Sequence, residues 1–243
     1  MSQAIRAIQV QLKLDNYYKG LLDGLWGNQS QQALRQAIDD NKLKIYFNFE
    51  AYKKIFNTRS LDQKFVNSIN GLFQVFNEYN NEDGSNPLYV AYMLATSYHE
   101  TAFTMQAIKE YGSYKYLSKY DTGRLAKALG NTPEADGDGI LYAGRGHVMI
   151  TGLDNYKKFT KLLGIDLVKN PDLALDPVVS AKILTIGSLR GVFTTRKLSD
   201  YIRTGKRLDF IRARAVINGT DKAESIALHA EKFLACITLV KCG

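Results

Sequence analysis

The 243-residue sequence predicts a mainly α-helical protein with a small N-terminal domain, residues 1–44, and a larger helical domain, residues 45–243. Apolar residues recur at helical spacing along most of the chain, whereas strand signals are confined to 45–49 and 147–150. Residues 130–147 hold five glycines and one proline, which predicts a long loop. Two helical domains joined near residue 44 are therefore the expected architecture.

The N-terminal domain begins with apolar residues near helical spacing, at Ile5, Ile8 and Leu12. Glycines at 20, 24 and 27 predict a turn, after which Ser30 could cap a second helix that runs to Ile38. A helix pair of this size buries little apolar surface, so we expect a third helix or a neighbouring domain to complete its core.

The larger domain shows longer helical patterns. An apolar stripe runs from Leu61 to Phe76, and Pro87 stands where the first position of the next helix is expected. That helix is apolar almost all round and ends near Glu100. Further helices are expected at about 177–190, 207–217 and 222–238 from the same periodicity.

Composition excludes several classes of protein. No apolar stretch approaches the roughly 18 residues of a membrane span, and the first residues lack the apolar core of a signal peptide. The two cysteines, Cys236 and Cys242, cannot form a disulfide framework. The net charge of +8 is spread along the chain, without the dense basic stripe that nucleic acid usually attracts. It could serve solubility alone or steer the protein to a polyanionic partner such as a bacterial envelope.

Two glutamates could perform acid–base chemistry. Glu100 ends an apolar helix, where burial and the helix dipole disfavour ionisation, as a general acid requires. Glu110 follows on a loop, where a hydrated, ionised carboxylate could activate water as a general base. Read alone, Glu100 could instead pair with a basic residue, and Glu110 could be an ordinary surface charge.

The segment GRGHVMITG, residues 144–152, adds groups that could assist. Its glycines allow the backbone to approach a ligand, Arg145 could pair with a carboxylate or substrate, and the Thr151 hydroxyl could hold a water. The segment could equally be a tight turn into a short strand. No metal is expected, because the DGDG sequence at 136–139 lacks the later calcium ligands and the three histidines lack HExxH spacing.

These motifs resemble glycoside hydrolase family 19, which includes plant chitinases and many bacteriophage endolysins. The sequences HET at 99–101, EYG at 110–112, GRG at 144–146, ITG at 150–152, NY at 155–156 and ING at 217–219 occur in the family's order. The similarity covers roughly residues 60–235. The resemblance implies a lysozyme-like, chitinase-like α-helical hydrolase domain that inverts the anomeric centre, with carboxylates about 6.5–9.5 Å apart.

The resemblance also implies roles for individual residues. Glu100 corresponds to the general acid, Glu110 to the general base, and Thr151 to the residue that positions the attacking water. The implied substrate-binding residues are His99, Tyr111, Arg145, Asn155, Tyr156 and Asn218. The chain departs from the family at His147, which replaces an aromatic residue or proline, and at Thr220, which replaces a glycine.

Residues 4–40 resemble a peptidoglycan-binding module, a three-helix unit often fused to such enzymes. The matching residues are Leu12, Tyr17, Tyr18, Gly20, Asp23, Gly24, Trp26, Gly27, Ala33 and Leu34. Among them, Tyr18, Asp23 and Trp26 are the implied wall-binding residues. The pairing of the two modules, without a signal peptide or several disulfides, resembles an endolysin more than a secreted plant chitinase.

The sequence therefore predicts a monomeric endolysin that hydrolyses the glycan of bacterial peptidoglycan and lyses the host. It implies no cofactor, no nucleic-acid partner and no stable membrane insertion. We expect synthesis in the host cytoplasm and action on the wall after release through a holin pore. The alternatives are a chitinase acting on poly-N-acetylglucosamine, a non-catalytic wall-binding protein on a lysozyme-like scaffold, and a zinc peptidase or amidase.

Overall fold

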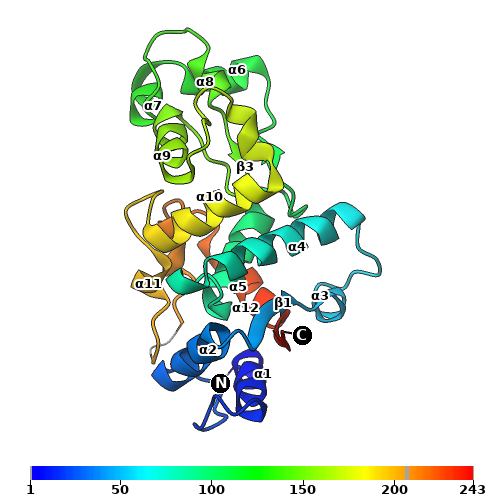
Figure 1. Cartoon of the computed structure of the whole chain (residues 1–243). Helices are drawn as coiled ribbons and strands as arrows, with labels where there is room; N and C mark the ends of the chain where they lie inside the picture. The colour runs from blue at the N-terminus through cyan, green and yellow to red at the C-terminus, as the bar shows by residue number, and fades with distance from the viewer. Residues whose placement is uncertain (1, 206–207, 243) are drawn as a thin grey trace. The chain divides into compact units, whose positions relative to one another are not determined.

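The computed structural model describes residues 2–205 and 208–242, and these are mainly helical, which confirms the predicted fold class. The chain divides into two compact units (Figure 1). Unit 1 contains residues 1–96 and 187–243, and unit 2 contains residues 97–186. The division falls within two helices, α5 (Pro87–Glu100) and α10 (Pro177–Arg190). The domain boundary expected at residue 44 stays a prediction.

The N-terminal part of unit 1 holds two helices, α1 (Gln3–Leu14) and α2 (Asn28–Asp39), among the described residues up to 44, whereas the resemblance implied three. An ordered loop connects the two helices, and hydrogen bonds from buried Gln9 fix its conformation. The Gln9 amide donates to Asp23 and to the Leu25 carbonyl, both at 2.9 Å, and accepts from the Gly24 backbone N–H. Gly24 has φ +69°, and a Cβ there would lie 2.6 Å from the Ser2 carbonyl oxygen, so the turn requires glycine.

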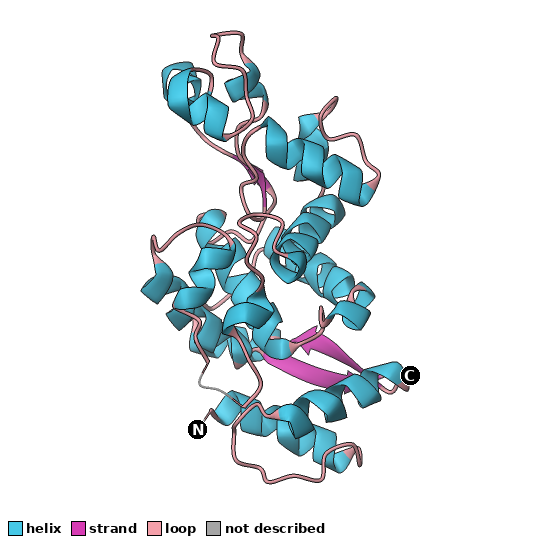
Figure 2. Cartoon of the chain, turned by 90° about the vertical axis from the view of Figure 1, so that its left-hand side faces the viewer, coloured by secondary structure: helices cyan, strands magenta, loops and turns pink. Residues whose placement is uncertain are grey.

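A two-stranded sheet joins the two ends of the chain within unit 1 (Figure 2). Strand β1 (Leu43–Phe47) pairs antiparallel with β4 (Ile237–Lys241), with Leu43 opposite Lys241 and Phe47 opposite Ile237. Side chains on β1 alternate between buried and exposed, as a strand with one covered face requires. The strand expected at 45–49 is therefore present, two residues earlier.

The N-terminal helices are also tied to the rest of unit 1 by polar contacts. Arg35 of α2 forms a two-pronged ion pair with Asp83, at 2.9 and 2.6 Å, and Gln31 donates to the same carboxylate at 3.0 Å. The Gln31 amide oxygen accepts from the Trp26 indole at 2.7 Å and from Asn86 at 3.0 Å. Asp83 follows the short 3₁₀ helix η1 (Asn80–Glu82).

The core of unit 1 lies between long helices. Helices α4 (Gln63–Glu78), α5 and α12 (Ala223–Leu234) bury their apolar faces, and α3 (Phe49–Ile55) contributes Tyr52. Aromatic rings from these elements and β1 contact one another at centroid distances of 4.3–6.2 Å, namely Phe47, Tyr52, Phe56, Phe65, Phe73 and Phe233. The helices predicted at 61–76, 88–100 and 222–238 are confirmed within a few residues.

The segment before α12 is less regular than expected. It contains α11 (Leu198–Tyr201) and the 3₁₀ helix η4 (Arg212–Val216), where the periodicity predicted one α-helix over 207–217. The described residues 208–211 are not helical, because Asp209 turns the chain and its carboxylate accepts from the Arg212 N–H at 3.0 Å. Residue 207 lies outside the described residues.

Unit 2 is built from short elements around a small sheet. Strand β2 (Ile108–Lys109) pairs antiparallel with β3 (Arg145–Gly146), and α9 (Leu153–Leu163) packs Tyr156 and Phe159 inside the unit. The remaining elements are α6 (Tyr114–Leu117), η2 (Ser118–Tyr120), α7 (Gly123–Ala128), α8 (Asp138–Leu141) and η3 (Pro171–Leu175). The strand expected at 147–150 is wrong, since only Ile150 of that segment forms a bridge, back to Arg145. Across the described residues, every helix falls short of the length and apolarity that a bilayer span requires.

Candidate active site

Glu100 is the last residue of α5 and is half-buried. The residues before it on the helix, 88–97, are all buried. The apolar helix therefore ends in a carboxylate at the edge of the core, as the sequence predicted.

The turn after Glu100 is unusually strained. Ala102, Phe103 and Met105 have φ values of 49°, 70° and 60°, in the left-handed region that non-glycine residues seldom adopt. The buried Thr101 hydroxyl holds this turn, because it donates to the Ser97 carbonyl at 2.8 Å and accepts from the Met105 N–H at 3.0 Å. Strained backbone of this kind concentrates at functional sites.

Glu110 follows strand β2, and its backbone and side chain are both fixed. The backbone N–H donates to the Gly144 carbonyl at 2.7 Å, beside the β2–β3 ladder. One carboxylate oxygen accepts from the Gly144 N–H at 3.1 Å, and the other accepts from the Tyr120 hydroxyl at 2.9 Å. A carboxylate that accepts on both oxygens is held in one orientation, which suits a base that must meet a water at a fixed place.

Gly144 brings Glu110 and Thr151 to the same place. A Cβ at residue 144 would lie 3.0 Å from Oε2 of Glu110 and 3.3 Å from Oγ1 of Thr151. The Thr151 hydroxyl donates to the Met149 carbonyl at 3.0 Å, so its lone pairs can accept from another group. The missing side chain of Gly144 thus leaves a carboxylate and a hydroxyl beside one small space.

Tyr120 connects Glu110 to a basic side chain. Burial is the main cause that raises the pKa of the Tyr120 hydroxyl, and the Glu110 carboxylate raises it further, so the hydroxyl stays a donor at neutral pH. The Lys119 ammonium lies over the Tyr120 ring at 4.5 Å and over the Tyr116 ring at 3.4 Å. These contacts fix the ring whose hydroxyl orients Glu110.

Arg145 faces the interior of unit 2, and only 3% of its side chain is exposed. Its guanidinium donates to Asp172 at 2.7 Å, to the carbonyls of Leu141 and Ala143 at 2.9 Å, and to the Tyr156 hydroxyl at 3.1 Å. Arg145 therefore fixes the segment that carries Gly144. The substrate-binding roles expected for Arg145 and Tyr156 stay predictions, and this geometry indicates an effect through the position of Glu110.

His147 is buried and joins two parts of the site. Its backbone N–H donates to the Ser180 hydroxyl at 2.7 Å, and Nε2 lies 3.1 Å from the Met105 carbonyl oxygen in the strained turn. Burial lowers the pKa of His147 to about 4, so the ring is neutral at pH 7. A neutral ring that faces a carbonyl carries its proton on Nε2.

The other predicted substrate-binding residues lie in varied settings. Asn155 donates to the Thr151 carbonyl at 2.8 Å, whereas Tyr111 is fully exposed beside Glu110. His99 is half-buried next to Glu100. Asn218 is exposed and belongs to unit 1, whereas the two glutamates and Thr151 belong to unit 2.

The three predicted wall-binding residues lie in and around the loop between α1 and α2. Tyr18 is 5% exposed and Trp26 is 3% exposed, so both rings pack inside the N-terminal part of unit 1. The Asp23 carboxylate accepts from the Gln9 amide and from the Leu25 N–H, both at 2.9 Å. Their wall-binding role stays a prediction, and their visible role is to shape this loop.

One group of acidic residues in the described part of the chain could hold a metal ion. Carboxylate oxygens of Asp121, Asp136 and Asp138 lie within 4.8 Å of one another. The Asp121 carboxylate accepts from the Gly137 and Gly139 N–H groups, at 3.0 and 2.9 Å, and Asp138 accepts from the Thr132 N–H. Backbone donors thus satisfy part of this cluster without an ion.

Sequence reasoning missed the contributions of Gly144, Tyr120 and Ser180. The sequence indicates that Gly144 allows a close backbone approach. Glu110 lies 34 residues earlier, so nothing in the sequence indicates that its carboxylate contacts Gly144. Tyr120 lies ten residues after Glu110 and reaches back through η2. These contacts join residues on separate short elements of unit 2. The hydrophobic periodicity of the sequence predicts single elements but not which of them contact one another.

Comparison with known proteins decides the family. The family model described as "Chitinase class I" matches residues 47–186, more than half of the chain. The chain belongs to glycoside hydrolase family 19. The matched segment contains Glu100, Glu110, Gly144 and Thr151, and it ends before Asn218.

Individual relatives are more distant or cover less. A glycosyl hydrolase family 19 domain-containing protein of Haemophilus influenzae is 55% identical over 42 residues, which is 17% of this chain and 21% of that protein. Chitinase C from Streptomyces griseus is 20% identical, with a TM-score of 0.41 over 73% of this chain and 77% of that one. A chitinase C mutant is 18% identical, with a TM-score of 0.44, and the match covers 76% of this chain and 88% of that one.

Replacing Gly144 with alanine should slow glycoside hydrolysis by about tenfold to a hundredfold, because the methyl group displaces the Glu110 carboxylate and the water beside Thr151. Steady-state rates would measure this, with melting temperature as the check on folding. Gly71→Ala is the matched control, since nothing lies within 4 Å of its Cβ position inside α4. A wild-type rate in Gly144→Ala would show that the space between Glu110 and Thr151 is not needed for hydrolysis.

Tyr120→Phe should lower kcat by about tenfold, because the hydrogen bond that orients Glu110 is lost while the ring and its lysine contact remain. Tyr116→Phe is the matched control, because Tyr116 also lies under Lys119 and has no recorded bond to Glu110 among the described residues. Equal kcat values for the two variants would exclude an orienting role for Tyr120.

Stability should fall as the pH drops from 6.5 to 4. The unfolded chain protonates His147 near its ordinary pKa of 6.5, whereas the folded protein resists protonation until about pH 4. The free energy of unfolding should therefore decrease by about 1.4 kcal/mol per pH unit in this window from His147 alone. Urea unfolding of wild type and His147→Gln at several pH values measures the difference, and parallel profiles would refute the assignment.

Proposed function

We propose that this protein is a glycosidase that cleaves the glycan strands of bacterial peptidoglycan by an inverting, single-displacement mechanism. The observation that carries the proposal is the pairing of Glu110 and Thr151 across Gly144, in the same unit as the half-buried Glu100. A proton donor, a fixed base and a group that positions water are what such cleavage requires.

In the proposed reaction, Glu100 donates its proton to the glycosidic oxygen as the bond to the anomeric carbon breaks. A water attacks that carbon from the opposite face, and its proton passes to Glu110. The Thr151 hydroxyl, whose proton is donated to the Met149 carbonyl, accepts a hydrogen bond from the water, so that the water oxygen points at the carbon. Both carboxyl groups return to their starting states when a proton moves through solvent.

Several observations favour peptidoglycan as the substrate. The N-terminal segment resembles a peptidoglycan-binding module, and its contacts with Asp83 and Asn86 join it to the rest of unit 1. The net charge of +8 suits an anionic wall. We infer an endolysin that lyses the host from within. The description of the matched family, "Chitinase class I", makes poly-N-acetylglucosamine the second candidate substrate.

Glu100→Gln should release new reducing ends from purified peptidoglycan about 10²–10⁴-fold more slowly than wild type, because the amide cannot protonate the leaving oxygen. Mass spectrometry of the products identifies the cleaved bond, and NMR of the first products reports the anomer formed. Glu134→Gln, an exposed carboxylate in the same unit, is the matched control.

Cleavage of chitin oligomers with peptidoglycan left intact would replace the main proposal with the chitinase. Intact glycan strands together with cut peptides would move the activity to a peptidase or amidase. A near wild-type rate for Glu100→Gln would show that another group is the acid.

A further inference from the structure

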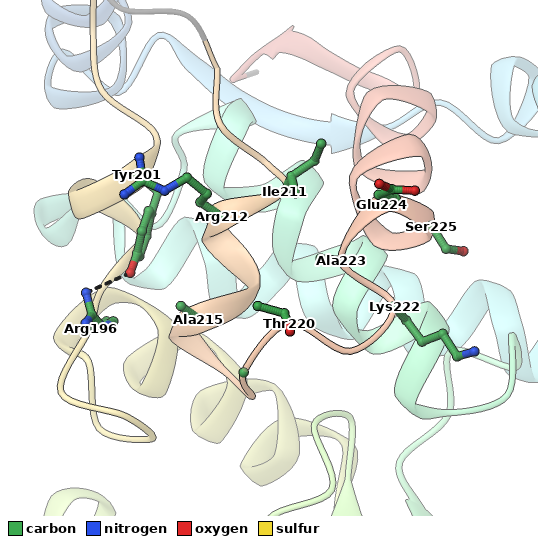
Figure 3. Close-up of a pocket in the computed structure, with 11 residues that line it drawn as sticks. Arg196, Tyr201, Ile211, Arg212, Ala215, Thr220, Lys222, Ala223, Glu224 and Ser225 are labelled. Carbon is green, nitrogen blue, oxygen red and sulfur yellow. Dashed lines mark hydrogen bonds between the residues drawn. The ribbon is translucent and has the colours of Figure 1, made fainter.

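A cavity lies within unit 1, and its lining residues do not include Glu100, Glu110 or Thr151, which belong to unit 2. It has a volume of about 770 Å³ and lies against α11, η4 and the beginning of α12 (Figure 3). Its lining includes Gly219 of the ING motif at 217–219 and the neighbouring Thr220, and the sequence motifs assign no role to the other lining residues. Its size is in the range of pockets that hold small ligands.

The cavity carries an excess of positive charge. Arg196, Arg212 and Lys222 line it, and Glu224 is the one acidic residue among its recorded lining. Arg212 lies 3.6 Å from the Asp209 carboxylate, but 77% of its side chain is exposed, so water screens that pair. Among the described residues, Arg196 and Lys222 have no recorded ion-pair partner. The cavity therefore offers at least two cationic groups to an anion.

The arginines are arranged around an aromatic ring. Arg196 donates to the Tyr201 hydroxyl at 3.0 Å, and the Arg212 guanidinium lies 6.0 Å from the Tyr201 ring centroid. Figure 3 shows Tyr201 lying between the two arginines. These contacts leave most of the five N–H donors of each guanidinium available. A planar guanidinium is suited to a carboxylate, which it can bind through two parallel hydrogen bonds.

The cavity also has an apolar part. Ile211, Ala215 and Ala223 contribute to its lining, and Ile211 is 52% exposed. A ligand that matches this surface has small aliphatic groups close to carboxylates. A neutral sugar polymer supplies no negative charge for the arginines. Inorganic phosphate supplies charge but no aliphatic group for the apolar part of the cavity.

Lys222 also lines the cavity, at an unusual backbone conformation. It has φ 57°, a left-handed conformation that glycine adopts without strain. A lysine at this position therefore carries backbone strain, and Figure 3 shows its side chain extending away from Arg196, Tyr201 and Arg212.

We propose that this cavity binds the peptide stem of peptidoglycan through its carboxylates, with the alanine methyl groups against the apolar wall. The inference rests on the proposed function and deepens it, because the stem is what distinguishes peptidoglycan from chitin. Arg196 and Arg212, on either side of Tyr201, hold the carboxylates. The site selects strands that carry a peptide stem and takes no part in bond cleavage.

Titration calorimetry of the full-length chain with a soluble stem tetrapeptide tests the proposal directly. The same peptide with its carboxylates amidated, tri-N-acetylchitotriose and inorganic phosphate serve as comparison probes. Wild type should bind the free-acid peptide at least about tenfold more tightly than each of these. Arg196→Gln and Arg212→Gln should each weaken peptide binding by about tenfold, the loss expected for one charged hydrogen-bonded contact. Arg59→Gln, an exposed arginine outside the cavity, is the matched control.

Hydrolysis gives a second readout. The preference for stem-bearing over peptide-free glycan strands, measured as the ratio of kcat/KM values, should fall about tenfold in Arg196→Gln and stay at the wild-type value in Arg59→Gln. Peptide binding that the arginine variants leave unaltered, or phosphate that binds as tightly as the peptide, would overturn the inference. If peptidoglycan is still cleaved alongside either result, the proposed function stands and only the binding inference fails. If the stem peptide binds but no peptidoglycan is cleaved, the binding inference stands and the proposed function fails.

Discussion

The hydrogen bonds between Glu110 and Gly144 are the interaction on which the candidate site depends. The backbone bond extends the two-residue ladder of β2 and β3, and the side-chain bond returns from the Gly144 N–H to the carboxylate. A ladder this short is weak by itself. Buried Arg145, bonded to two carbonyls, Tyr156 and Asp172, holds the segment in place. The position of the Glu110 carboxylate is therefore set by hydrogen bonds that hold the segment carrying Gly144.

The same segment also reaches the turn that follows Glu100. His147 lies three residues after Gly144, and its ring faces the Met105 carbonyl. That turn contains three residues with positive φ, so it needs outside support to keep its shape. Residues 144–147 thus contact Glu110 on one side and support the chain after Glu100 on the other. One short segment thus contacts Glu110 and the turn that follows Glu100.

The sequence could predict features that arise from local chemistry. Pro87, the apolar run after it and the terminal Glu100 define α5, and the structure agrees because both helix start and core face are local signals. The strand expected at 147–150 is wrong because Gly146 and Met149, with φ of 86° and 51°, turn the chain back instead. The contact of Glu110 with Tyr120 and Gly144 was out of reach, because it joins residues on separate short elements. Family order identified the residue types, and the structure supplied their partners.

The chemistry of the glycan explains why substrate choice would reside outside the hydrolytic centre. Chitin and peptidoglycan strands both consist of linked N-acetylated amino sugars, so an acid, a base and a water meet similar bonds in each. The difference lies in the charged peptide that one strand carries. A carboxylate that acts as a base, as proposed for Glu110, repels rather than attracts such anions. Cations that lie outside the acid–base pair, as at Arg196 and Arg212, can attract the charged substituent. If recognition and cleavage are separate in this way, as proposed, one catalytic arrangement could serve different polymers.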